Sequence, residues 1–159
     1  MPEQPAHGRK PKYHHGNLRE ALIEGAMRLL EEEGLEGLTL RRAAKRAEVS
    51  HAAPAHHFGD LRGLLAAVAE RGYNDLLAAI DGARESIGAD APPLAEVELI
   101  GKCYVSFAAE HKPLFRVMLH PQLADKSTFP NLEHASMSPF ARLFAATERA
   151  QRRGNLGPG

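Results

Sequence analysis

The segment from Thr39 to Asp60, TLRRAAKRAEVSHAAPAHHFGD, constrains the fold more than any other part of the chain. Thr39 can cap a helix, because its hydroxyl accepts a hydrogen bond from a free amide of the first turn. A leucine and three alanines between positions 40 and 47 then form one small apolar helix face. Ser50 can cap a second, short helix over roughly 51–58, whose small and polar residues suit a helix that lies against a surface. Two short helices with a tight turn describe a helix-turn-helix, although any helical hairpin has the same pattern.

Positive charge is local in this chain. The 159 residues have a formal net charge of zero, so a general electrostatic attraction to nucleic acid is absent. Basic residues nevertheless outnumber acidic ones in the segment 1–19, and an acidic block follows at 31–36. The first helix of the pair then carries four basic residues and no acidic one: Arg41, Arg42, Lys45 and Arg46.

The single cysteine and the hydropathy pattern bear on location. Cys103 alone excludes a disulfide within the chain and a cysteine-based zinc site. No apolar run follows the basic N-terminus, so no secretory signal is visible. No stretch of about 18 uninterrupted apolar residues exists, so no membrane span is expected. We therefore expect a reduced, cytoplasmic location.

The flanking segments complete an all-α pattern. Residues 1–16 are predicted to be a flexible basic arm, which either touches a phosphate backbone or serves only as a solubilising tail. Asn17 opens an amphipathic helix in capping-box position with Glu20, and this helix should stop at Gly34. The segment 17–59 is then a three-helix unit that contains the helix-turn-helix.

The remaining residues, 60–159, are predicted to form a helical regulatory domain. Asp60 caps a connecting helix over 60–86, long enough to join the N-terminal unit to a second core. Further helices are expected at 94–111, 113–120 and 131–153, with a loop at 121–130 that has one helical turn at Leu123–Ala124. Pro139 should kink the last helix or restart it.

Five segments carry a family resemblance that spans nearly the whole chain. They read YHHGNLREAL at 13–22, EGLEGLTLR at 33–41, AAKRAEVS at 43–50, HAAP…HF at 51–58 and HKPLFRVMLHPQLADK at 111–126. The first four resemble the TetR family of bacterial one-component transcriptional regulators, and the last resembles the ligand-binding half of one TetR subgroup. The resemblance implies a homodimeric all-α repressor that binds a double-stranded DNA operator and is released by a small-molecule inducer.

The resemblance also implies which residues contact DNA. Family members contact phosphates at the start of the first helix of the pair, where free helix amides, Arg and Thr suit phosphate oxygens. The expected DNA-binding residues are Thr39, Arg41, Arg42, Ser50, His51, Ala52, Ala53, Ala55, His56, His57 and Arg62.

Three positions depart from the family pattern. Ala55 stands where a Tyr is usual, and Leu61 where a Lys is usual, with Arg62 the nearest substitute. Glu48 replaces a Gly in the turn, which adds a negative charge near DNA and costs backbone strain if the position needs a positive φ. These departures motivate an alternative function, a helical small-molecule-binding protein with weakened or lost DNA binding.

The family usually has two further long C-terminal helices, which form a four-helix interface between subunits. The chain ends at Gly159 without them. We expect either a truncated product or a different mode of dimerisation. Without a dimer, two recognition helices are not held one DNA turn apart, and affinity should fall steeply.

A ligand pocket is expected between the connecting helix and the C-terminal helices. Aromatic and sulfur-containing residues at helical spacing favour an apolar or aromatic ligand, although the same residues also suit a plain core. The candidates are Tyr73, Leu77, Cys103, Tyr104, Phe107, Phe115, Met118, Leu119, Phe140 and Phe144.

Metal, cofactor and catalytic sites find no support in the sequence. Nine histidines are present, but the adjacent pairs His14–His15 and His56–His57 point about 100° apart on a helix and chelate poorly. His111 and His120 lack a carboxylate partner at ligand spacing. No phosphate loop or HExxH motif occurs, and Cys103 has no recognisable base. We expect no metal, no cofactor and no enzymatic activity.

Overall fold

The computed structural model describes residues 15–88 and 91–154. Every regular element in these ranges is helical, which confirms the predicted all-α class. In chain order the elements are α1 (His15–Glu33), the 3-10 turn η1 (Leu35–Gly37), α2 (Leu40–Arg46), α3 (Ala53–Phe58), α4 (Leu61–Ser86), α5 (Pro93–Glu110), α6 (Lys112–Met118), the 3-10 turn η2 (Pro121–Leu123) and α7 (Pro130–Arg152).

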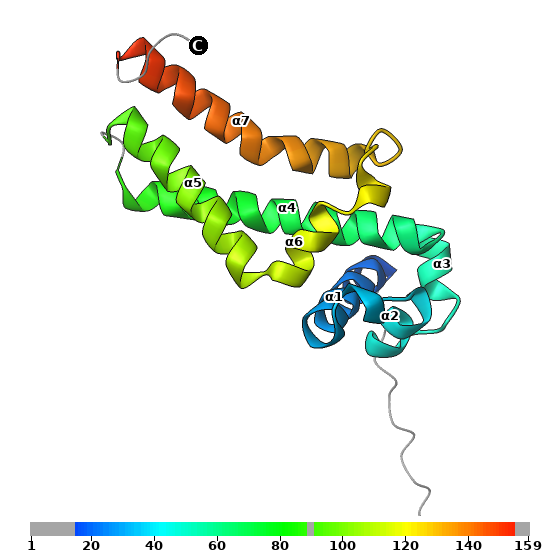
Figure 1. The fold of residues 1–159 in the computed structure, drawn as a ribbon. Helices are drawn as coiled ribbons and strands as arrows, with labels where there is room; N and C mark the ends of the chain where they lie inside the picture. Colours follow the sequence, from blue (N-terminus) through cyan, green and yellow to red (C-terminus); the bar gives the residue numbers. More distant parts are fainter. Residues whose placement is uncertain (1–14, 89–90, 155–159) are drawn as a thin grey trace, which may run out of the picture.

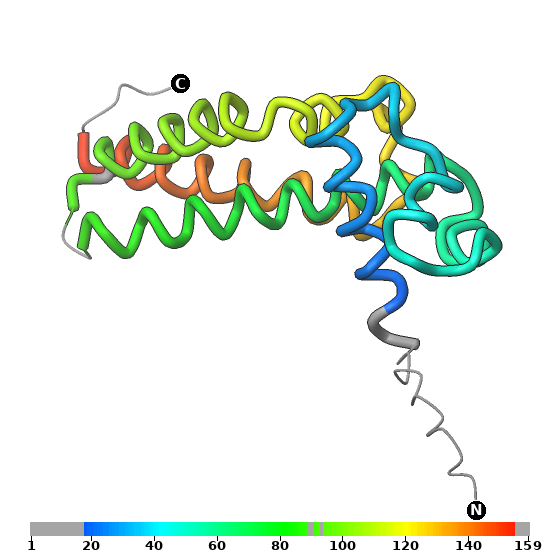
Figure 2. The backbone as a smooth tube through the Cα atoms, turned by 90° about the horizontal axis from the view of Figure 1, so that it is seen from below, coloured from blue at the N-terminus to red at the C-terminus, as the bar shows by residue number. Residues whose placement is uncertain are grey.

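Helix α4 is the spine of the molecule. Helices α1, α2 and α3 gather at its N-terminal end, while α5, α6 and α7 pack along the rest of it (Figure 1). The view from below shows α5 and α7 running beside α4 away from the N-terminal helices (Figure 2). One end of α4 therefore belongs to the helix-turn-helix and the other to the C-terminal helices.

A continuous apolar core follows α4. Leu64, Val68, Leu76 and Ile80 are fully buried along its length. Their spacings of four and eight residues keep them on one side of the helix. Gly72 allows α6 to approach closely, because a Cβ at this position would lie 2.8 Å from the sulfur of Met118. The core therefore extends without interruption from α1 to α7.

Several predicted helix ends are confirmed. The Thr39 hydroxyl accepts a hydrogen bond from the Arg42 amide at 3.2 Å and begins α2. The Asp60 carboxylate accepts from the Gly63 amide at 2.9 Å and begins α4. Helix α1 ends before Gly34, which has a φ of 74°. These ends depend on local chemistry that the sequence displays.

Two predicted helix starts need correction. Helix α1 begins at His15 rather than Asn17, so Asn17 lies inside the helix, and Glu20 forms an ion pair with Arg71 instead of a capping box. Helix α3 begins at Ala53 rather than His51, with Pro54 in its first turn and no side-chain cap from Ser50. Helix α7 continues through the buried Pro139, so the restart does not occur there, and the alternative of a kink stays a prediction.

Other expectations concern residues at the margins. Residues 1–14 of the predicted arm lie outside the described residues, whereas 15 and 16 are helical. The C-terminal predictions fit closely, since α5, α6 and α7 each begin one residue before the expected position. The expected helical turn at Leu123–Ala124 occurs slightly earlier, as η2. The division into units at 17–59 and 60–159 stays a prediction.

Candidate functional site

Helices α2 and α3 form the helix-turn-helix, with a turn whose backbone is unusual. Glu48 lies in this turn with a φ of 56°, and no other non-glycine residue in the described ranges has a positive φ. The Val49 amide donates to the Ala44 carbonyl at 3.0 Å, which closes the turn against α2. Pro54 is fully buried and fixes the start of α3 against the rest of the unit.

The residues expected to read DNA are not equally accessible. Ser50, His51 and Ala52 are exposed, but they lie in the turn before α3 rather than in the helix. Ala55 and His56 are exposed on α3 itself. Ala53 and His57, which were also expected in the recognition helix, are half-buried. The exposed surface therefore combines the turn with one side of a six-residue helix.

The basic residues of α2 divide into two pairs. Arg42 forms an ion pair with Glu33, and Arg46 forms one with Glu32, both at the end of α1. Arg41 and Lys45 are exposed and have no ion pair within the part of the chain that the structure describes. Arg41 and Lys45 are thus free to contact a phosphate, whereas the charges of Arg42 and Arg46 are already offset by a carboxylate partner.

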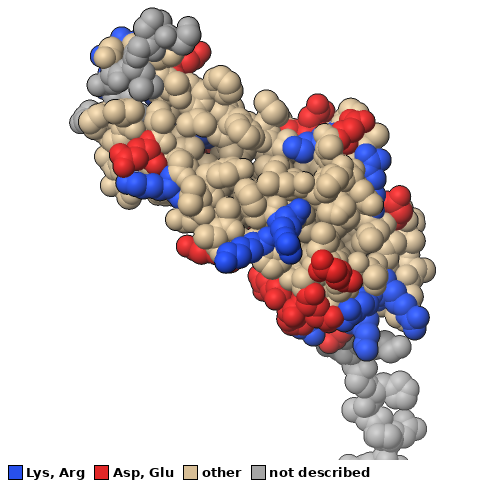
Figure 3. Space-filling view, in the orientation of Figure 1, with Lys and Arg blue, Asp and Glu red and all other residues tan. Residues whose placement is uncertain are grey.

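Charge gathers around this end of the molecule. Blue and red side chains cluster over α1 to α3 at the lower right of Figure 3. The predicted acidic block at 31–36 therefore lies directly against the basic helix. Both runs of charge are visible in the sequence. Their pairing was not predicted, because it has no sequence signal beyond the opposite sign of the charges.

Arg62 is engaged in contacts within the protein. Its Nε donates to the Gln122 carbonyl at 2.9 Å. Its Nη2 lies 3.3 Å from both the Asp125 carbonyl oxygen and the Thr128 hydroxyl. The guanidinium also lies 5.0 Å from the centre of the Phe129 ring. These contacts attach the loop between η2 and α7 to the first turn of α4, and the expected contact of Arg62 with DNA stays a prediction.

An apolar cavity of about 410 Å³ lies between α4, α5 and α7. Three of the expected ligand-binding residues line it, namely Tyr73, Tyr104 and Phe140. The other lining residues were not among the predicted ligand contacts. Their sequence signal is recurrence on the same helix faces at spacings of three and four residues. They are Leu76, Ile80, Ile100, Gly101, Val105, Pro139 and Leu143.

Polar groups are few around this cavity. The Tyr73 hydroxyl donates to the Met118 carbonyl at 3.2 Å, and burial raises the pKa of this tyrosine. Tyr104 meets the Phe115 ring edge-on, with the ring centres 5.4 Å apart. A neutral ligand with an apolar body fits such walls better than a charged one, because an unpaired charge there would lose its hydration.

The remaining expected ligand residues lie elsewhere. Cys103 and Phe107 line a separate cavity of about 420 Å³ against α1. Met118 is buried in the core, and Leu77 lines none of the cavities described here. Leu119 and Phe144 are exposed, at 59% and 70%. The structure thus brings together part of the set and separates the rest.

Comparisons with known proteins agree with this geometry. The family described as "Bacterial regulatory proteins, tetR family" matches residues 22–68. The HTH-type transcriptional regulator BetI of Burkholderia mallei (strain NCTC 10229) is 40% identical over 74 residues, which are 46% of this chain and 37% of that protein. The chain thus aligns with little more than a third of that curated relative.

Two solved structures resemble most of the chain. A protein with unknown function from Rhodococcus sp. RHA1 is 35% identical, covers 94% of this chain and 76% of its own, and superposes with a TM-score of 0.79. The TetR family transcriptional regulator PfmR from Thermus thermophilus has a TM-score of 0.62 at 24% identity, covers 87% of this chain and 74% of its own, and shows a shared fold. The range matched by the family includes Glu48, Ala55 and Leu61.

In the described ranges, no helix is long and apolar enough to cross a membrane. The same ranges contain no group of three metal-ligating side chains close enough to hold an ion.

Proposed function

Because this chain belongs to the TetR family of bacterial regulatory proteins, we propose that it is a DNA-binding transcriptional repressor that a small apolar molecule releases from its operator. The observation that carries the proposal is the helix-turn-helix with free Arg41 and Lys45 beside an exposed α3 surface. The operator is a DNA duplex in the cytoplasm, and a homodimer presents two such units to successive turns of it.

The apolar cavity supplies the ligand half of the proposal. Tyr73, Leu76 and Ile80 of α4 line it, and α4 begins three residues after the end of α3. A ligand that shifts α4 therefore also shifts the recognition helix. Coupling of this kind is reciprocal, so a ligand that weakens DNA binding is itself bound more weakly by the DNA complex.

DNA binding can be tested without knowledge of the operator. Duplexes selected by the purified chain from a randomised pool are titrated by fluorescence anisotropy at several salt concentrations. Arg41→Ala is expected to weaken binding and to lower the salt slope by about 1, the value for one lost phosphate contact. Arg28→Ala is the matched control, since Arg28 is an exposed basic residue of α1 that pairs with Glu24.

Two outcomes would contradict the proposal. Failure of the chain to retain any duplex above a nonspecific level would rule out specific DNA binding. Equal binding by wild type and Arg41→Ala would remove the helix-turn-helix as the contact surface. Sedimentation of the retained complex gives the number of chains per duplex, and two chains are expected.

A further inference from the structure

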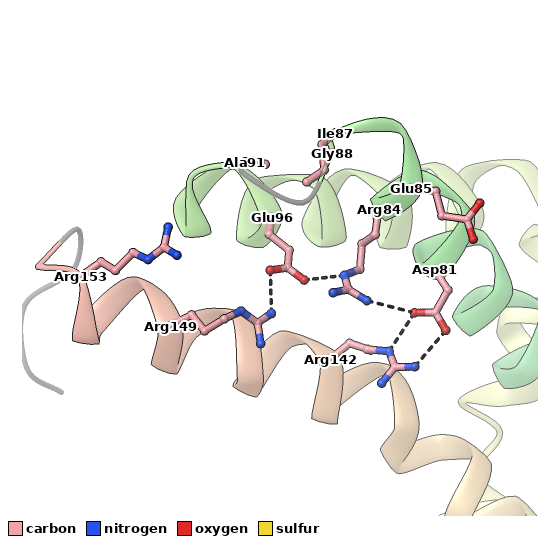
Figure 4. Close-up of a pocket in the computed structure, with 10 residues that line it drawn as sticks. All are labelled: Asp81, Arg84, Glu85, Ile87, Gly88, Ala91, Glu96, Arg142, Arg149 and Arg153. Carbon is pink, nitrogen blue, oxygen red and sulfur yellow. Dashed lines mark hydrogen bonds and ion pairs between the residues drawn. The ribbon is translucent and has the colours of Figure 1, made fainter.

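A third cavity, of about 540 Å³, lies at the end of α4 farthest from the helix-turn-helix. It is formed where the C-terminal ends of α4 and α7 meet the N-terminal end of α5 (Figure 4). Its lining shares no residue with the apolar cavity. Its chemistry is also different, because four arginines and three carboxylates surround it.

Ion pairs alternate along one wall of this cavity. Arg142 donates to both oxygens of Asp81, at 2.8 and 3.0 Å. Arg84 lies between the two carboxylates, 3.8 Å from Asp81 and 2.5 Å from Glu96. Arg149 donates to the other oxygen of Glu96 at 2.6 Å. The carboxylates therefore hold three guanidinium groups in fixed positions.

Glu96 is the fixed centre of this arrangement. Its residue is only 9% exposed. Burial alone would raise the pKa of its carboxyl, but hydrogen bonds from Arg149 and Arg84 outweigh burial and lower the pKa. The carboxylate therefore stays charged and keeps both arginines oriented at neutral pH.

The cavity has more positive charge than its carboxylates neutralise. Arg153 lines it and has no ion pair within the described part of the chain. Glu85 also lines it, but its carboxylate is turned away from the network (Figure 4). The four guanidiniums thus face two carboxylates. Each guanidinium has five N–H donors, so the ion pairs leave donors unused.

We propose that this cavity binds a small organic oxyanion, with Arg153 and Arg149 as its main contacts. Guanidinium groups suit carboxylate and phosphate oxygens because they donate two parallel hydrogen bonds. Ile87 and Ala91 add an apolar wall for the body of such a molecule. The site is independent of the apolar cavity, so one chain can respond to two ligands of different chemistry.

The test follows the arginine Nε–H resonances of the full chain by NMR. Inorganic phosphate and succinate are titrated separately, with sodium chloride added to keep the ionic strength constant. A saturable shift of arginine resonances is expected with at least one of them. Saturation by phosphate alone assigns the site to a phosphate group, and saturation by succinate alone assigns it to a carboxylate.

Two variants locate the response. Arg153→Ala is expected to weaken anion binding about tenfold, the effect of one lost charge-assisted hydrogen bond. Arg152→Ala is the matched control, because Arg152 is the neighbouring exposed arginine at the end of α7 and pairs with Glu148 outside the cavity. Anion binding at the basic helix α2 would be equal in both variants. No saturable shift with either anion, or equal affinity in wild type and Arg153→Ala, would overturn the proposal.

Discussion

Glu48 has the most strained backbone in the helix-turn-helix. Its φ of 56° is left-handed, a conformation that costs a residue with a Cβ roughly 1–2 kcal/mol. Its side chain is exposed, so burial does not offset this cost. The sequence predicts backbone strain at Glu48 only if the turn requires a positive φ. The observed φ of 56° meets this condition.

We predict that Glu48→Gly raises the free energy of unfolding by about 0.5–1 kcal/mol. Glycine removes the left-handed penalty but has more freedom in the unfolded chain, so part of the gain is lost. Urea denaturation followed by circular dichroism measures the change. A decrease in stability would show that the turn relaxes around Glu48 at no cost.

Glu48→Gln separates strain from charge. This variant keeps the left-handed residue and removes the negative charge, so its stability should match that of wild type. Both variants should bind DNA more tightly than wild type, because each removes a charge that repels phosphate. A gain in affinity for glycine alone would assign the effect to backbone geometry.

At the scale of elements, the junction between α3 and α4 leaves no room for change. Gly63 lies in the first turn of α4, and a Cβ there would lie 1.9 Å from the carbonyl oxygen of Phe58. Phe58 is the last residue of α3, and its carbonyl also accepts from the Asp60 amide at 3.0 Å. The angle between α3 and α4 therefore requires a residue without a Cβ at position 63.

Gly63→Ala is expected to lower the free energy of unfolding by about 3 kcal/mol, the upper part of the range for overpacking. The contact is with backbone, which cannot rotate away as a side chain can. Gly82→Ala is the matched control in the same helix, since a Cβ there meets nothing within 4 Å. It should stabilise the chain by up to about 1 kcal/mol through helix propensity. Chemical denaturation measures the free energy of unfolding of both variants. Similar values for the two would contradict the tight junction between α3 and α4.

The elements that sequence could predict are those with local signals. Thr39 and Asp60 each accept a hydrogen bond from the amide three residues later in the chain, so their role as helix caps is visible in the sequence. The start of α1 at His15 carries no such signal. The contacts of Arg42 with Glu33 and of Arg62 with the loop near Asp125 join distant parts of the chain. They depend on tertiary packing, so spacing along the sequence cannot reveal them.

The whole molecule is organised by α4, which lines the apolar cavity and the arginine-lined cavity and carries the helix-turn-helix at its first turn. The apolar cavity offers a direct way to test this arrangement. Gly101 lines it from α5, and a Cβ at that position meets nothing within 4 Å. A larger side chain can therefore enter the cavity without a clash against the backbone.

Gly101→Leu is predicted to weaken binding of the neutral dye N-phenyl-1-naphthylamine about tenfold, a loss of about 1.4 kcal/mol. The added side chain occupies space that the dye needs. Fluorescence titration measures the affinity, and Gly82→Leu serves as the control on an open part of α4. In wild type, the dye should weaken DNA binding by the same factor by which DNA weakens dye binding. Equal dye affinity in all three proteins would place the dye outside this cavity.

The attachment of the loop by Arg62 has an evolutionary consequence. Two of its three hydrogen-bond acceptors are main-chain carbonyls, those of Gln122 and Asp125. Replacing the side chains of these residues leaves both acceptors in place. The loop can therefore diversify its outward-facing chemistry while it remains joined to the base of α4, whereas a single codon change at position 62 would release it.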